Sequence, residues 1–338
     1  MYNTCIVGAG ATGLSLLLLL QEAGTDISKV VIIDPHFDGG DLARKWTAVH
    51  SNTPWSKTTG SLATHCPSLS ASAAAQPSDP TKTTPLVQIA HLLRNLAAPA
   101  LKKARQIQGT ATAAAYSSAT NTWTITATIG GKDTTVEAAK LVLASGSEPR
   151  TMDLPIPSIP LEIALDSTRL QHFIQPGQHV SIFGTMHSGT LVIRNAVALG
   201  ATVAAYYNTA EPFYWASNGA YDGIKEEAAT IADDIVAGRI PVDLIPIQDT
   251  AKLIRSSAAA DWVIYAMGFL PRETIRCSVD GIEKSAKAYN GDTGALTDIP
   301  SAWGFGVAYP NRAPDGIHWD VSVAAFLDHM KKQINAFI

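Results

Sequence analysis

Two glycine turns hold the residues of this sequence whose types and spacing could do chemistry. The first covers residues 8–13 and reads GAGATG, and the second covers residues 184–189 and reads GTMHSG. In such a turn the glycines allow a tight bend, a close approach of a pyrophosphate and close packing of the helix that follows. The free N–H groups at the start of that helix then attract the phosphates. Both turns are therefore typical of places where nucleotides bind.

The first turn lies in a complete strand–turn–helix–strand pattern. An apolar strand over residues 4–7 precedes it, a helix follows it to about Gly24, and the second strand reads VVIID. That strand ends at Asp34, 21 positions after Gly13 (34 − 13), where an acidic side chain can bind both hydroxyls of an adenosine ribose. We therefore predict a dinucleotide site here. Its expected contacts are Gly8, Gly10, Ala11, Gly13 and Asp34.

The second turn departs from this pattern at its middle position. Gly184 and Gly189 keep the tight turn and the close helix packing, but Met186 replaces the glycine that admits the pyrophosphate. Conventional binding would therefore be crowded. The next strand ends in YYN at Asn208 without an acidic residue, so the ribose clamp of an NAD site is missing and we expect NADPH rather than NADH. No arginine stands at that strand end, although Arg194 could reach a 2′-phosphate from the helix.

His187 and Ser188 follow the methionine at the start of the second helix. His187 could hydrogen-bond at the helix entrance or simply be partly buried, which is the commoner role of such a residue. Alternatively it could face a flavin and contact a nicotinamide or a substrate, and it is therefore a candidate catalytic residue. Ser188 stands before the last glycine of the turn, and we expect it to contact the nucleotide.

Three further motifs follow the first turn in order along the chain. They read LVLASGSEPR (141–150), VIYAMGFLPR (263–272) and GALTDIPSAWGFGVAYP (294–310). Together with GAGATG they resemble the two-dinucleotide-binding-domain flavoproteins, which include disulfide reductases, ferredoxin reductases, flavin-containing monooxygenases and N-hydroxylating monooxygenases. The resemblance spans nearly the whole chain. It implies an α/β fold of two Rossmann-like three-layer domains, an FAD domain with a smaller NAD(P)-type domain inserted.

The resemblance also predicts how the chain is divided. The FAD-binding domain would begin with residues 1–152, be interrupted by an NAD(P)H-type domain over 153–265, and return over 266–338. Within the first part we expect a long irregular stretch up to about Thr84. A helix from Pro85 to about Arg105 and two alternating β segments would follow it.

The later motifs would contact the flavin and form the crossings between domains. Gly146 and Gly268 would lie at the crossings, and Gly306 would pass under the ribityl chain of FAD. The superfamily usually has aspartate after this last glycine; here it is Val307, so one side-chain hydrogen bond to the ribityl chain is lost and backbone N–H groups remain. The final helix, expected from about Asp320, would direct its start at the pyrimidine edge of the flavin. Asp320 would be its N-cap or, alternatively, a catalytic base.

The motif HSNTPW supplies further candidates near the flavin. Asn52 resembles an asparagine that lies beside the isoalloxazine in flavin-containing monooxygenases, which makes it a candidate catalytic residue, with Thr53 as a cofactor contact. The alternative is an ordinary Asx turn at Asn52. Trp46 and Trp55 would stack on the cofactor or pack in the core. The aromatic stretch 211–223 would line a substrate entrance or pack the smaller domain.

Composition excludes several classes of function. The chain has 338 residues, 46% hydrophobic, and a net charge of −4 without a long basic or acidic run, so we expect neither nucleic-acid nor membrane binding. The apolar run LSLLLLL is too short to span a bilayer and is predicted to be a buried helix. Cys5, Cys66 and Cys277 form no C-x-x-C pair, which predicts a reducing, cytoplasmic setting and no metal site built from cysteines.

These features favour an FAD-dependent, NAD(P)H-using oxidoreductase of the monooxygenase type. Hydride would pass to flavin N5, and oxygen or another acceptor would reoxidise the flavin. The missing dithiol argues against a disulfide reductase, and a peroxidase-like role for Cys66 is a weaker alternative. Two other hypotheses stay open: an oxidase or dehydrogenase with a degenerate nicotinamide domain, and a flavin-binding sensor without turnover. The expected partners are a small-molecule substrate and, as one option, a second copy of the chain.

Overall fold

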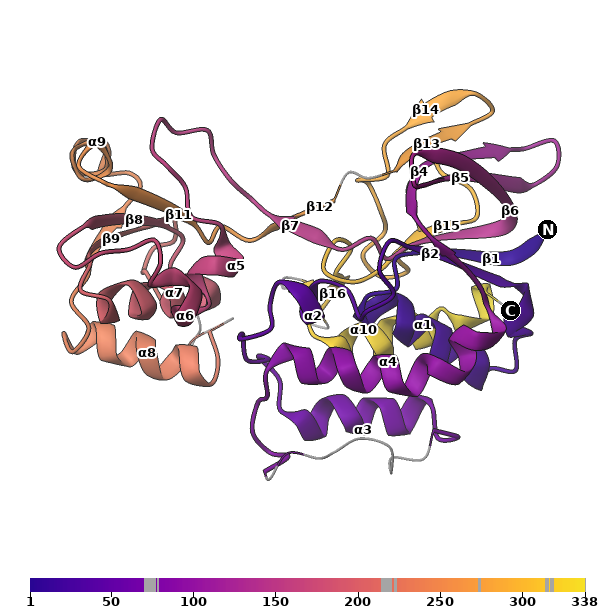
Figure 1. Cartoon of the computed structure of the whole chain (residues 1–338), viewed down its shortest axis with the longest axis horizontal. Coiled ribbons are helices and arrows are strands. Elements are labelled where there is room, and N and C mark those ends of the chain that lie inside the picture. The colour runs from indigo at the N-terminus through magenta and orange to yellow at the C-terminus, as the bar shows by residue number, and fades with distance from the viewer. Residues whose placement is uncertain are drawn as a thin grey trace. The chain divides into compact units, whose positions relative to one another are not determined.

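The chain forms two compact units in the computed structural model. The first unit comprises residues 1–148 and 271–338, and the second comprises residues 149–270 (Figure 1). The structure describes residues 1–69, 77, 79–213, 221, 224–272, 275–313, 316 and 319–337. Short strands β7 and β12 pair with each other where the chain passes from one unit to the other and back. Their bounds are Ser147–Pro149 and Phe269–Pro271.

A nine-stranded sheet organises the first unit, in the order β14-β13-β4-β5-β6-β1-β2-β3 with β15 beside β6. The long strand β6 pairs antiparallel with β5 and parallel with β1, so it joins the meander of β4–β6 to the parallel strands. The strands are β1 Tyr2–Val7, β2 Val30–Asp34, β3 Arg105–Gln108, β4 Thr110–Ser117, β5 Thr122–Ile129, β6 Lys132–Leu143, β13 Arg276–Val279, β14 Ile282–Lys284 and β15 Ala302–Gly304.

Helices cover one face of the parallel strands. Alternate residues of β1 point to opposite faces: Ile6 packs with the helices, whereas Cys5 and Val7 pack with the residues of the meander. The helices are α1 Ala11–Glu22, η1 Ile27–Lys29, α2 Asp41–Arg44, α3 Trp55–His65, α4 Leu86–Lys103, α10 Val323–Lys332 and η4 Ile334–Ala336. A small pair, β16 Asn311–Arg312 and β17 Trp319–Asp320, precedes α10.

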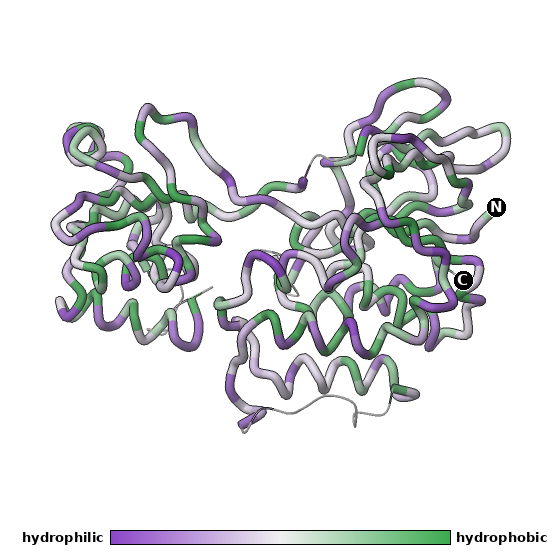
Figure 2. Tube along the Cα trace, in the orientation of Figure 1, coloured by the Kyte–Doolittle hydropathy of each residue, from purple (hydrophilic) through white to green (hydrophobic). Residues whose placement is uncertain are grey.

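The leucine run of α1 is a core helix, as the sequence predicts. Leu14 and residues 16–20 are at most 1% exposed, and the hydrophobic segments at the centre of each unit can be followed along the trace in Figure 2. No helix among the described residues is long and apolar enough to cross a membrane.

The expected irregular stretch before Thr84 was wrong in part, because it contains α2 and α3. Helix α3 buries Trp55, Thr58 and Leu62, three positions on one side of the helix. Ser, Thr and Gly fill most of its other positions, and these residues have low helix propensity, so the sequence carries little helical signal. The predicted helix after Pro85 is present but ends at Lys103, and β3 follows it.

The second unit is a parallel sheet of four strands in the order β10-β9-β8-β11. The strands are β8 His179–Phe183, β9 Thr202–Tyr207, β10 Asp243–Pro246 and β11 Trp262–Tyr265. The helices are α5 Leu161–Ala164, α6 Ser167–Leu170, α7 His187–Ala198, α8 Glu227–Val236 and α9 Thr250–Ala258. The predicted fold class, two Rossmann-like α/β domains, is confirmed.

The two units repeat one backbone arrangement around their glycine turns. In the first unit the N–H of Gly8 donates to the carbonyl of Ile33 at 2.8 Å, and the N–H of Ala144 donates to Val7 at 2.8 Å. In the second unit, Gly184 donates to Tyr206 at 2.8 Å and Ala266 to Phe183 at 2.7 Å. Each turn is therefore bonded on both sides by the neighbouring strands, which fixes its position at the strand ends.

Close backbone packing in the first turn leads to a prediction about stability. A methyl group on Gly13 would collide with the carbonyl oxygen of Gly8, whereas a methyl group on Gly60, also a helical glycine, would meet none of the described residues within 4 Å. We expect Gly13→Ala to lower the free energy of unfolding by about 1–3 kcal/mol. The matched control Gly60→Ala should raise it by roughly 0.5–1 kcal/mol through helix propensity. Urea denaturation of both variants measures the difference, and equal stabilities would contradict the packing argument.

Candidate dinucleotide sites

Gly8 and Gly13 are required by the protein's own backbone. Gly8 has a φ of +106°, and a side chain on it would collide with the carbonyl of Ala144. A side chain on Gly13 would collide with the carbonyl of Gly8. At these two positions the strand, the turn and the helix pack so closely that only glycine fits.

Gly10 differs, because none of the described residues requires a glycine there. Its φ of −75° and ψ of −171° suit any residue, and within the described part of the chain an added Cβ would meet Gly40 Cα at 3.7 Å and Gly39 O at 3.9 Å. Helix α1 begins at the next residue without a side-chain cap and without an acidic residue in its first turn. The space beside Gly10 and the uncapped N–H groups therefore fit a pyrophosphate, as in an FAD site.

The carboxylate of Asp34 is fixed at the end of β2 by three backbone N–H groups. Oδ2 accepts from Ala9 at 2.7 Å, and Oδ1 accepts from His36 and from Phe37, each at 2.8 Å. A carboxylate offers about four acceptor positions, so one is left for a ribose hydroxyl. The structure thus places Asp34 against the turn, and its contact with the ribose hydroxyls remains a prediction.

The pair Gly39–Gly40 is a part of this site that the sequence analysis missed. Gly39 forms a β-bridge with Gly10, and a Cβ on Gly40 would lie 2.8 Å from Gly10 Cα. Both glycines have positive φ, and Asp38 Oδ1 accepts the N–H of Gly40 at 3.0 Å. A Gly-Gly pair soon after the acidic residue at the end of the second strand could have indicated this contact from the sequence.

The closing motif reaches the same turn. A Cβ on Gly306 would lie 2.5 Å from Thr12 Oγ1, so this segment lies against the first turn of α1. Gly306 has a φ of +91°, and the neighbouring Val307 is 39% exposed. Gly146, with a φ of +75°, follows Ala144, on whose carbonyl Gly8 packs. The structure therefore brings together Gly8, Gly10, Ala11, Gly13, Asp34, Gly146, Gly306 and Val307.

The alternative of an Asx turn at Asn52 was wrong. Such a turn needs the N–H of the residue two positions later, and Pro54 has none. The turn is made by Ser51, whose Oγ donates to the Thr53 carbonyl at 2.9 Å and accepts its N–H at 3.1 Å. Asn52 Oδ1 instead accepts the Thr53 hydroxyl at 3.0 Å. A contact of Asn52 or Thr53 with a flavin remains a prediction.

The two tryptophans of this region are both buried. Trp55 is 2% exposed and packs in the helical core of the first unit, which favours the packing role for it. Its indole N–H has no hydrogen-bond partner among the described residues. Trp46 is 9% exposed, so the protein itself covers most of its surface.

The expected start of the final helix at Asp320 was wrong. Helix α10 begins at Val323, and its N-cap is Ser322, whose hydroxyl accepts the N–H of Ala325 at 3.1 Å. Asp320 lies in β17, paired with Asn311. Serine is as good an N-cap as aspartate, so the closer residue takes the role.

The backbone of the second turn packs in the same way as that of the first. A side chain on Gly184 would collide with the carbonyl of Ala266, and one on Gly189 with the carbonyl of Gly184. Met186 has a φ of −73° and a ψ of −166°, within a few degrees of Gly10. Its half-buried side chain is thus unstrained and begins where the first turn leaves space for a phosphate.

His187 is the first residue of α7 and is mostly buried. Its Nδ1 has no hydrogen-bond partner among the described residues, so it does not form the hydrogen bond that we considered at the helix entrance. Burial lowers the pKa of the imidazole, and the charge of Lys225 lowers it further while Glu227 raises it. Ser188 follows it, half-buried. Gly268 has a φ of +81°, and a Cβ on it would meet none of the described residues within 4 Å.

Arg194 is not free for a 2′-phosphate in this structure. Its guanidinium forms an ion pair with Glu227 and donates to Asn195 Oδ1 at 3.1 and 3.0 Å. The hydroxyl of Tyr206, near the end of β9, is hydrogen-bonded to Ser181 and Ser256. Most of the aromatic stretch 211–223 lies outside the described residues.

The three cysteines offer no dithiol. Cys5 lies in β1, Cys66 follows α3, and Cys277 lies in β13, all at most 2% exposed. Burial raises the pKa of Cys66 and of Cys277 to about 11, and raises that of Cys5 further. A peroxidase-like role for Cys66 therefore lacks a thiolate. Among the described residues there is no cluster of ligands that could hold a metal ion.

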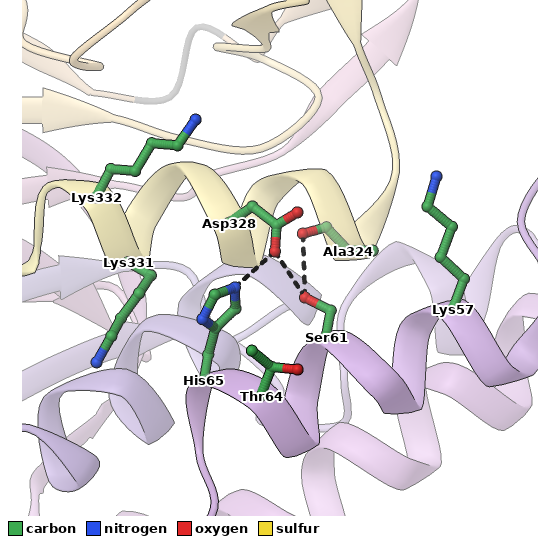
Figure 3. A pocket seen from close by; sticks show the side chains of 8 residues that line it. All are labelled: Lys57, Ser61, Thr64, His65, Ala324, Asp328, Lys331 and Lys332. Atoms are coloured by element: carbon green, nitrogen blue, oxygen red, sulfur yellow. Dashed lines mark hydrogen bonds and ion pairs between the residues drawn. The ribbon is translucent and has the colours of Figure 1, made fainter.

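A pocket of about 580 Å³ between α3 and α10 holds a serine, a histidine and an aspartate (Figure 3). Ser61 Oγ donates to Asp328 Oδ1 at 2.9 Å, and His65 Nε2 lies 2.7 Å from the same oxygen. In a hydrolase triad the histidine stands between serine and carboxylate, so this order cannot activate the serine.

Comparison with known proteins agrees with this geometry. Residues 2–283 match the family model described as pyridine nucleotide-disulphide oxidoreductase. "Monooxygenase AgnR1" of Paecilomyces divaricatus is 24% identical, over 97% of this chain and 95% of that protein.

Solved structures show the same fold. Bacillithiol disulfide reductase Bdr (YpdA) of Staphylococcus aureus has a TM-score of 0.63 at 15% identity, covering 99% of this chain and 97% of that one. A mutant of the flavin monooxygenase of Stenotrophomonas maltophilia has a TM-score of 0.64 at 14% identity, covering 99% and 97%. The resemblance proposed from the motifs is confirmed. The chain belongs to the pyridine nucleotide-disulphide oxidoreductase family, which consists of FAD-dependent oxidoreductases.

Proposed function

We propose that this protein is an NAD(P)H-reduced flavin monooxygenase rather than a disulfide reductase. The observation that carries the proposal is the placement of its three thiols, buried in separate elements with raised pKa values. No described pair of cysteines can relay electrons to a disulfide substrate. The similarity to a protein named as a monooxygenase, over almost the full length of both chains, supports the same choice.

The residues of the first turn would hold FAD. The N–H groups at the start of α1 would bind the pyrophosphate beside Gly10, and Asp34 would bind the adenosine ribose. Gly306 and Val307 would offer backbone N–H groups near Thr12 to the rest of the cofactor, because those of Gly304 and Phe305 already donate to Gly294 and Leu143. Bound FAD would supply the redox chemistry, taking hydride from a reductant and passing electrons to an acceptor.

The second turn would hold the nicotinamide dinucleotide, with NADPH preferred. The preference is supported by the end of β9, where Tyr207 and Asn208 take the place of an acidic ribose clamp. His187 and Ser188 would lie beside the phosphates at the start of α7. His187 would act there as a neutral imidazole, because burial lowers its pKa. Its Nδ1 is buried and has no hydrogen-bond partner among the described residues.

One observation favours a second candidate function. Met186 occupies the position of the phosphate-admitting glycine, which is compatible with an oxidase or dehydrogenase whose substrate reduces the flavin directly. In that case the second unit would bind no nicotinamide.

Anaerobic reduction of the flavin distinguishes the two candidates. We expect purified FAD-loaded protein to lose its visible flavin absorbance on mixing with NADPH, and to lose it more slowly with NADH. The absence of bleaching with either dinucleotide would exclude the first candidate. Bleaching by an amine, alcohol or thiol in their place would then support the second.

The glycine geometry predicts that Gly10→Ala separates cofactor binding from folding. The added methyl group makes only ordinary contacts with Gly39 and Gly40, so the apoprotein should keep its thermal midpoint within a few degrees. FAD affinity should fall at least about tenfold, because the methyl group occupies space that the pyrophosphate needs. Fluorescence titration of apoprotein with FAD measures this. Unchanged affinity would show that the pyrophosphate does not lie at Gly10.

Restoring glycine in the second turn should help NADPH. Met186→Gly removes the side chain without changing a backbone conformation that both residues adopt, and we expect the KM for NADPH to fall about threefold to tenfold, the equivalent of about 1 kcal/mol. The helix should lose little stability, since Met186 is its N-cap rather than an interior residue. Stopped-flow reduction at varied NADPH concentration provides the measurement. A KM that stays the same or rises would show that Met186 does not crowd the dinucleotide.

A further inference from the structure

Two arginines occupy equivalent places in the internal repeat. ASGSEPR and AMGFLPR each end in an arginine four positions after the glycine. In the first unit the N–H of Arg272 donates to the carbonyl of Gly146 at 3.2 Å, and in the second unit the N–H of Arg150 donates to that of Gly268 at 2.9 Å. The backbone of each arginine is therefore hydrogen-bonded to a glycine that follows a strand. That glycine lies near the glycine turn of the same unit.

Arg272 shows what such an arginine binds in the first unit. Its Nη2 donates to Asp41 Oδ2 at 2.6 Å and to the Ser147 carbonyl at 3.2 Å, while Nη1 donates to the Ser145 carbonyl at 3.2 Å. Asp41 begins α2 directly after Gly40, which lies on Gly10. The guanidinium thus binds an anion that the protein itself holds next to the phosphate turn.

Arg150 has the same backbone position but no anion. Its side chain is exposed, and it makes no ion pair or side-chain hydrogen bond with any residue in the described part of the chain. The other arginine near the second turn, Arg194, is paired with Glu227. Helix α7 begins without a side-chain cap or an acidic residue in its first turn, so this neighbourhood offers positive potential and unused donors.

We propose that Arg150 binds a phosphate group of the nicotinamide dinucleotide on the second turn. The inference rests on the proposed function. Arg150 would supply the positive charge that the end of β9 lacks. A guanidinium binds phosphate oxygens through its N–H donors. In the first unit one such donor, Nη2 of Arg272, binds the carboxylate of Asp41. The group contacted is either the pyrophosphate, common to both dinucleotides, or the 2′-phosphate of the NADP form.

Calorimetric binding of NADP⁺ and NAD⁺ to the FAD-loaded protein tests the proposal. We expect Arg150→Ala to raise the Kd for NADP⁺ about tenfold or more, since a charge-assisted contact is lost, and Arg150→Lys to give a smaller loss. Arg255→Ala is the matched control, because Arg255 is an exposed arginine of the same unit on α9. A loss confined to NADP⁺ identifies the 2′-phosphate, and an equal loss with NAD⁺ identifies the pyrophosphate.

The outcomes separate this inference from the proposed function. Unchanged affinities in Arg150→Ala overturn the role of Arg150, even where NADPH reduces the flavin of the natural protein. Binding of NADP⁺ that depends on Arg150, without reduction of the flavin by NADPH, would uphold this inference and overturn the proposed function. A natural protein that binds neither dinucleotide would overturn both. The variant keeps its backbone N–H and alters an exposed side chain, so the thermal midpoint should be unchanged.

Discussion

Contact between backbones, without intervening side chains, is the constraint on which the rest of the structure depends. Gly13 packs on the carbonyl of Gly8, and Gly8 packs on the carbonyl of Ala144. Any Cβ at either glycine would push the helix away from the strand ends. Because neither carries one, the uncapped start of α1 lies at the edge of the sheet, where the N–H groups of its first turn face outward. Asp34, Gly39–Gly40 and segment 304–307 then gather around a position that these contacts have fixed.

The second unit shows that this constraint fixes the fold without fixing the ligand. Gly184 and Gly189 repeat the two contacts, and the hydrogen bonds to the flanking strands are repeated as well. Met186 and Gly10 share a backbone conformation that any residue can adopt, so replacing one by the other costs the fold little. Selection for ligand binding can therefore act on this position while the strand, turn and helix stay the same. The same separation explains how relatives with disulfide-reductase and monooxygenase names share one architecture.

The parts that could be predicted from sequence are those where one local rule decides the structure. The turns, β1, β2 and α1, and in the second unit β9 and α7, follow from apolar runs next to glycines, and they formed as expected. Helix α3 did not, because its few buried positions stand among serines and threonines. At Asp320 two good capping residues lie close together, and the choice of Ser322 depends on how β17 pairs. The absence of an Asx turn at Asn52, by contrast, could have been predicted from Pro54, which has no N–H to donate.

Long-range contacts within the flavin site could not be derived from local rules. Thr12 and Gly306 lie 294 positions apart (306 − 12), and only the closed fold shows that one leaves room for the other. Arg272 and Asp41 likewise lie 231 positions apart in the sequence and are hydrogen-bonded to each other. Arg272 thus joins the segment that follows Gly40 to the residues that follow β6. Motif order along the chain indicated that these segments belong to one site, because a family resemblance carries that information. It did not indicate which atoms meet.

The cysteines show why membership of the family leaves the electron acceptor open. The family model is named for disulphide chemistry, yet every thiol of this chain is buried and its pKa raised, so none is a ready nucleophile. On the proposed function, electrons leave the flavin directly to a diffusible acceptor rather than through the protein. Such a site needs no further redox group, only a flavin held at a fixed place and a space for the acceptor. Gly8, Gly13 and the hydrogen bonds to Asp34 fix the turn and the carboxylate against which the adenosine end of FAD would bind.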